Sequence, residues 1–197
     1  SVLALVGRLS VSLTRELLAA AGEQVMQAPR TAGLTTESLE ALRHYLDGEA
    51  AYRRSDFAGA AAAFERAVGV DSTFALAWAR LSSSYGWLEN ISSAAGATAG
   101  DRAVALADRL PARERMMVEA ERGLTEGDLD AVVTLRQAVV KYPDDAEAWF
   151  LLGEFYRHNG RGAGVSTEED ELEVFRKAVA LDPGFTPYYV HLIESLI

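Results

Sequence analysis

Residues 71–85, DSTFALAWARLSSSY, decide the fold, because residues 142–156, YPDDAEAWFLLGEFY, repeat their pattern. A shift of 71 positions superposes five identical residues: Ala75, Ala77, Trp78, Leu81 and Tyr85 on Ala146, Ala148, Trp149, Leu152 and Tyr156. The aromatic and leucine positions recur at helical spacing and therefore lie on one face of a helix. The pattern predicts a helix that occurs at least twice.

A second helical pattern also repeats along the chain. A shift of 111 positions superposes six more identities: Phe64, Ala67, Val68, Asp71, Phe74 and Leu81 on Phe175, Ala178, Val179, Asp182, Phe185 and Leu192. The small residues let two helices approach closely, and Pro143 and Pro183 end the second helix because proline cannot continue it. The repeated unit is therefore predicted to be a pair of helices.

The order W-x-x-L-G-x-x-Y, then A-x-x-x-F and proline, resembles the tetratricopeptide repeat. This resemblance covers about residues 37–197 and implies an all-α fold, a right-handed α-α superhelix of about four helix pairs with flanking helices. The expected units are 37–72, 73–111, 112–143 and 144–183, with a partial unit at 184–197.

Residues 1–36 are expected to precede the repeat domain as an amphipathic helix, over about 2–21, and a linker. Together with phrases such as Leu39–Leu42 and Asp71–Ala77, they look similar to the carboxyl-terminal regions of bacterial signalling proteins such as serine/threonine kinases. That resemblance implies that the helix ends a preceding domain and that the repeats are a regulatory part of a larger protein.

Three further predictions concern where individual helices of the repeat begin and end. The first helix of the repeat domain is expected at 37–54, and Leu88–Gly100 reads as a lengthened connection before a helix at about 98–109. Ser166–Glu169 offers a capping box for the second helix of the fourth unit.

The composition limits the function. Of 197 residues, 29 are acidic and 19 are basic, which gives a formal net charge of -10 that repels nucleic-acid phosphates. Protein or peptide partners of neutral to basic charge are expected instead. Because there is no cysteine, a disulfide framework, a thiolate zinc site and a catalytic thiol are excluded. Charged residues such as Arg8 interrupt the apolar amino end, so no membrane insertion by this segment is expected.

The resemblance places a second stripe of each first helix on the concave side of the superhelix. This stripe alternates aromatic and charged side chains, which suits an extended peptide or a partner helix. The predicted partner-binding groove comprises Tyr45, Glu49, Tyr52, Arg53, Ser83, Trp87, Phe150, Glu154, Arg157 and His158.

Other residues are interpreted as structural. Trp78, Tyr85, Trp149 and Tyr156 hold positions that define the repeat and are expected to pack inward. The histidines have no partners arranged as in H-E-x-x-H, so no metal and no cofactor are predicted. No acid, base and nucleophile converge, so we expect no enzyme activity within these residues.

The leading hypothesis is a non-catalytic protein-interaction scaffold. One alternative is a self-association module that forms a homodimer through the apolar stripes near the two ends. Another is a small-molecule sensor between Trp87 and the loop at the 160s. A cytoplasmic location is favoured, and an extracytoplasmic one follows if the parent protein has a membrane span ahead of the repeats.

Overall fold

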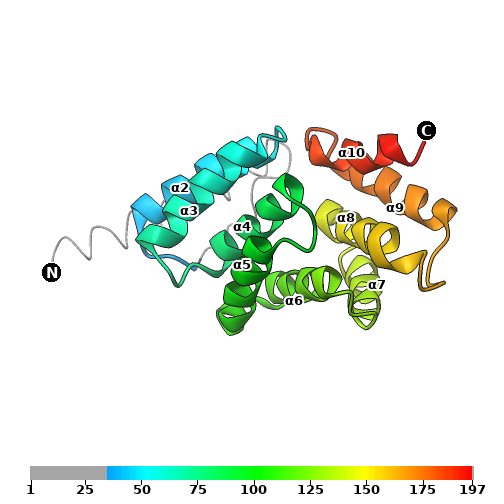
Figure 1. Ribbon diagram of the computed structural model, residues 1–197, viewed down its shortest axis with the longest axis horizontal. Helices are drawn as coiled ribbons and strands as arrows, with labels where there is room; N and C mark the ends of the chain where they lie inside the picture. The colour runs from blue at the N-terminus through cyan, green and yellow to red at the C-terminus, as the bar shows by residue number, and fades with distance from the viewer. Residues whose placement is uncertain (1–34, 197) are drawn as a thin grey trace, which may run out of the picture. The chain divides into compact units, whose positions relative to one another are not determined.

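The computed structural model describes residues 35–196, which form nine α-helices in consecutive packed pairs and no strand (Figure 1). The predicted helix at 2–21 lies outside the described residues. The chain divides into two compact units, and α6 (Ala112–Glu126) crosses the division after Glu114. The first unit contains α2 (Leu39–Tyr52), α3 (Phe57–Val70), α4 (Ala75–Leu88) and α5 (Ala94–Ala105). The second contains α7 (Ala131–Lys141), α8 (Ala146–Phe155), α9 (Glu168–Leu181) and α10 (Pro187–Glu194).

The helices of each pair approach closely where a glycine meets a phenylalanine. In the first unit, α2 and α3 lie side by side (Figure 1), and a Cβ added at Gly48 would lie 2.6 Å from Cε1 of Phe64. In the second unit, a Cβ at Gly153 of α8 would lie 2.5 Å from Cε1 of Phe175 on α9. Both phenylalanines are fully buried. The same contact therefore holds a hairpin in each unit.

The aromatic residue that opens each pattern binds the turn before its own helix. Nε1 of Trp78 donates to the carbonyl of Ser72, and Nε1 of Trp149 donates to that of Pro143, six residues earlier in both cases. The hydroxyl of Tyr189 on α10 donates to the carbonyl of Pro183, again six residues earlier. The two tryptophans are half-buried, so the expected inward packing is only partial. Each indole N–H binds a carbonyl of the turn before its helix.

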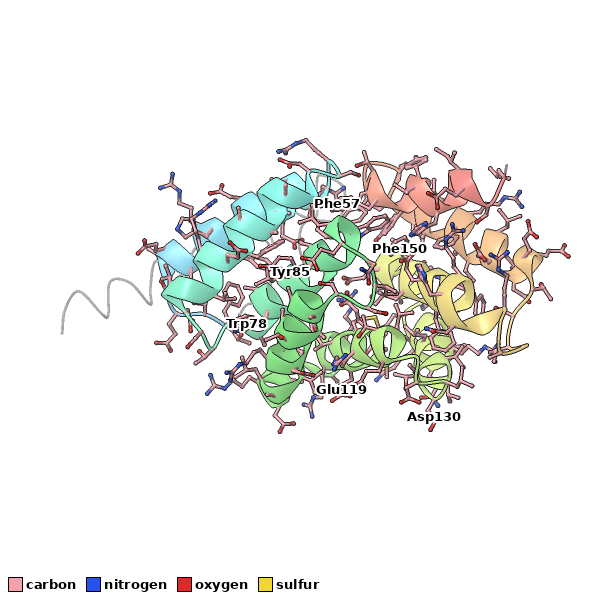
Figure 2. All side chains as sticks on the ribbon, in the orientation of Figure 1. Phe57, Trp78, Tyr85, Glu119, Asp130 and Phe150 are labelled. Atoms are coloured by element: carbon pink, nitrogen blue, oxygen red, sulfur yellow. The ribbon has the colours of Figure 1, made fainter. Side chains whose placement is uncertain are left out.

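The tyrosine later in each first helix reaches the preceding second helix. In the first unit, the Tyr85 hydroxyl donates to Glu65 of α3 at 2.5 Å, and burial together with that carboxylate raises the pKa of Tyr85 to about 12. In the second unit, Nε of Arg136 on α7 donates to the Tyr156 hydroxyl at 3.1 Å. Glu65 and Arg136 are equivalent under the shift of 71 positions, so the repeat conserves the contact while it changes the charge. Figure 2 shows Trp78 and Tyr85 among the side chains of the first unit.

The helix ends correct two sequence predictions. The long connection before 98 is wrong, because the Ser93 hydroxyl accepts a hydrogen bond from the Gly96 amide and starts α5 at Ala94. The predicted capping box is one residue out of register, because Thr167 caps α9 and Asp170 returns the bond. A serine, threonine or asparagine at several adjacent positions satisfies the same cap pattern, so the sequence alone does not fix the register.

Among the described residues, none of the helices combines the length and apolarity needed to cross a bilayer.

Candidate functional site

In the first unit, three predicted groove residues are brought together between α2 and α4. Glu49 of α2 forms an ion pair with Arg80 of α4, with Oε1 and Nε 2.8 Å apart. One turn further along, Nε1 of Trp87 donates to the Tyr52 hydroxyl at 2.9 Å, and Arg80 lies over the Tyr52 ring. Consecutive first helices thus meet along a face that carries both charge and aromatic surface.

Trp87 is the large aromatic side chain of this face that stays partly open to solvent. The Trp87 ring stacks on the ring of Phe57, which is labelled in Figure 2, with 4.7 Å between the ring centroids and an interplanar angle of 2°. Trp87 is half-buried. Ser83 lies one turn before it on the same helix and is half-buried, with its hydroxyl donating to the Ala79 carbonyl. Arg53 groups with the second unit, where its guanidinium donates to both carboxylate oxygens of Asp182 at 2.9 Å and 3.0 Å.

Three aromatic residues of the predicted groove lie in the core. Tyr45 is only 4% exposed, because Phe64 and Phe74 pack against its ring. Tyr52 is 5% exposed and Phe150 is 7% exposed. The sequence could not show this, because the rings that cover them come from the next helices of the repeat. Tyr45, Tyr52 and Phe150 are therefore core residues and not exposed anchors.

In the second unit, the remaining predicted residues meet α9 and α10. Arg157 pairs with Glu194 at 2.7 Å and with the fully buried Glu171 at 3.2 Å. Arg157 and His158 lie on a π-helical turn, Tyr156–Gly160, that continues α8. Nδ2 of Asn159 on the same turn donates to the Leu124 carbonyl at the end of α6. The turn is thus anchored on both sides, and single π-helical turns of this kind are frequent at functional sites.

A cluster of one carboxylate and two imidazoles lies beside this turn, and the sequence analysis missed it. Glu154 Oε2 lies 3.7 Å from Nε2 of His158, four residues later, and Glu154 Oε1 lies 3.2 Å from Nε2 of His191 on α10. The sequence analysis expected no histidine with partners arranged as in a metal motif, whereas the structure places His158 and His191 beside Glu154. The i, i+4 spacing of Glu154 and His158 is visible in the sequence, but His191 is 33 positions further on and joins them only through the packing of α10.

The two imidazoles of this cluster have different protonation preferences. Burial lowers the pKa of His158 below its usual value. Burial also opposes protonation of His191, but the nearby carboxylates of Glu154 and Glu194 outweigh it and raise the pKa of His191. The hydrogen bond from His191 in turn lowers the pKa of the Glu194 carboxyl. One cluster thus holds one favoured imidazolium and one favoured neutral ring.

Comparison with known families identifies the repeat. The family model described as tetratricopeptide repeat matches residues 134–161, which include most of α7 and all of α8. The helix pair in this segment is therefore similar to a tetratricopeptide repeat. The origin in a bacterial signalling protein stays a prediction. The comparison with curated protein sequences gives no match.

The solved structures that are similar to this chain include two of MamA. One, titled "Crystal structure of MamA protein", shares 17% identity over 79% of this chain and 80% of its own, with a TM-score of 0.42. The other, a MamA from Desulfovibrio magneticus RS-1 that begins at residue 41, shares 19% identity over 80% of this chain and 84% of its own, also with a TM-score of 0.42.

Proposed function

We propose that this chain is a non-catalytic protein-interaction scaffold whose tetratricopeptide repeats bind a peptide or helix of neutral to basic charge. The observation that carries the proposal is the face between α2 and α4, where Glu49, Arg80 and Trp87 combine paired charges with a partly open aromatic ring. A stacked, rigid tryptophan loses little conformational freedom on binding, which makes it a suitable anchor for a partner side chain.

The charge of the chain supports the choice of partner. With a net charge of -10, the long-range field attracts basic segments and repels acidic ones. A partner with a terminal carboxylate would meet Glu49 on α2 in the first unit, and a like charge placed there costs affinity. We therefore place a neutral or lysine- and arginine-containing peptide along α2 and α4.

A display selection of random peptides against the whole chain tests this function. The selected peptides are expected to be neutral or basic, and a Ser83→Arg variant is expected to bind them at least tenfold more weakly, because the new cation and its bulk lie on the proposed face. Thr98→Arg is the matched control. It adds the same side chain at an exposed position of α5, the other helix of the same pair, and binding should not change.

Two outcomes would reject the function. One is a selection that yields acidic peptides only, and the other is equal binding by the Ser83→Arg and Thr98→Arg variants. Removal of Tyr45 or Phe150 is a poor test, because both side chains are buried and their loss would unfold the repeat.

Self-association is a second candidate, and it rests on α10 and the residues after it. Ile193 and Leu196 are 54% and 59% exposed, which is high for side chains of this size. If a second copy covers them, sedimentation velocity will show a mass that rises with concentration, and Ile193→Glu will abolish the rise. A constant monomer mass at all concentrations would exclude this candidate.

A further inference from the structure

The cluster of Glu154, His158 and His191 has the donor set of a metal site. Each residue offers one ligand atom, and these three atoms all lie within 4.8 Å of one another. Two imidazole nitrogens and one carboxylate oxygen are ligands that Zn²⁺ and related transition-metal ions prefer. The three residues come from α8, the π-helical turn and α10, so the site exists only when the second unit is folded.

The observed distances are close to those that a bound ion requires. Zinc lies about 2.0–2.2 Å from its nitrogen and oxygen ligands, so neighbouring ligand atoms of a tetrahedral site are roughly 3.3 Å apart. Glu154 Oε1 lies 3.2 Å from His191 Nε2, and Glu154 Oε2 lies 3.7 Å from His158 Nε2. Side-chain rotations that move these atoms by about an ångström would bring all three into coordination distance.

Glu154 is a buried carboxylate, and one of its two oxygens makes no hydrogen bond. It is 9% exposed, and its Oε1 atom makes no hydrogen bond of acceptable geometry although it is buried and points at His191. A buried carboxylate oxygen without a hydrogen bond is costly and calls for a specific explanation. A cation between Oε1 and the two imidazoles would satisfy it.

The surroundings of the cluster also suit a metal ion. Nδ1 of His191 lies 3.0 Å from Oε2 of Glu194, and such a carboxylate orients the imidazole ring with Nε2 toward Glu154. Three carboxylates, Glu154, Glu171 and Glu194, are set against two guanidinium groups, Arg157 and Arg161, so the side chains around the two imidazoles carry one net negative charge. His158 has 31% of its side chain exposed, which gives an ion a path from solvent.

From these observations we infer that Glu154, His158 and His191 bind a divalent transition-metal ion of the zinc type, with a coordination position left for water or for a ligand from a partner. The ion links α8 to α10 and thereby stabilises the docking of the last helix. This site is independent of the peptide face between α2 and α4.

Calorimetric titration of the whole chain with zinc chloride, without a polyhistidine tag, tests the site. The chain has only three histidines, so His44 on α2 provides the matched control. We expect one zinc ion per chain, an affinity at least tenfold lower in His158→Ala, and an unchanged affinity in His44→Ala. His158→Ala is preferred to His191→Ala because the ring of His191 also packs against Phe175.

Imidazole signals in nuclear magnetic resonance spectra give a second reading that needs no variant. Zinc is expected to shift the ring signals of His158 and His191 and to leave those of His44 in place. The inference is overturned if zinc does not bind, if all three histidines respond alike, or if His158→Ala binds zinc as tightly as the unaltered chain.

Discussion

The contact between Gly48 and Phe64 gives the sharpest test of how the helix pairs are built. Gly48→Ala adds one methyl group on α2, and its carbon would lie 2.6 Å, 2.8 Å and 2.8 Å from three atoms of the Phe64 ring. Separations below about 3 Å do not occur between real Cβ atoms and their neighbours. Because Phe64 is fully buried, its ring cannot swing into solvent, and the two helices have to move apart.

The magnitude follows from two opposing effects. Overpacking of a well-packed core costs about 1–3 kcal/mol, while alanine in place of glycine favours a helix by about 1 kcal/mol. Gly48→Ala is therefore expected to lower the free energy of unfolding by up to about 2 kcal/mol. Gly86→Ala on α4 has no atom within 4 Å of the added carbon, so only the helix effect remains, and the variant is expected to gain about 0.5–1 kcal/mol.

Urea denaturation followed by far-ultraviolet circular dichroism measures both variants under identical conditions. Gly48 and Gly86 lie in the same compact unit, so both free energies refer to the same cooperative structure. The expected gap between the variants is about 2 kcal/mol, with opposite signs relative to the unaltered chain. If Gly48→Ala is as stable as Gly86→Ala, the close packing of α2 on α3 is wrong.

Three further predictions concern other contacts. Glu171→Gln is expected to lower the free energy of unfolding by about 3 kcal/mol, because it leaves Arg157 beside a buried neutral amide, and chemical denaturation checks this. Burial would raise the pKa of Asp71, but hydrogen bonds from Thr36 and Thr73 outweigh it and lower the pKa, so its stabilisation is present above pH 3.8 and is lost as the pH falls through the lowered value. A carboxyl titration by magnetic resonance should show Thr36→Val raising that pKa, and no change would contradict the role of Thr36. Trp149→Phe removes the bond to the turn carbonyl and should cost about 1 kcal/mol in thermal denaturation; an unchanged midpoint would show that the bond contributes nothing.

The repeat itself could be predicted from the sequence because its signals are local. Ala77 and Leu81 recur at 71 positions' distance, and both are buried, as their i, i+4 spacing on one helical face requires. The start of α5 could not be predicted in the same way. Its cap depends on which of several small polar residues meets the Gly96 amide, and neighbouring serines satisfy the pattern equally well.

The candidate site was harder to predict because exposure depends on neighbouring helices. Tyr45 shares a helical stripe with Glu49, yet Phe74 from the following turn covers Tyr45 and leaves Glu49 to pair with Arg80. The cluster at Glu154 also needs His191 from α10, and no spacing within α8 or the π-helical turn indicates that residue. Patterns along one helix predict which residues share a face, whereas packing between helices decides which of them meet.

The most direct test of the central claim, that one glycine-to-phenylalanine packing builds a helix pair in each unit, is the chemical shift of the glycine α-protons. Because Gly48 and Gly153 lie against the rings of Phe64 and Phe175, their α-protons are expected to carry strong ring-current shifts and to show cross-relaxation to those rings. The α-protons of Gly86, with open space around it, should resonate near ordinary helical values. Ordinary shifts at both Gly48 and Gly153, or contacts from them to other rings, would contradict the account.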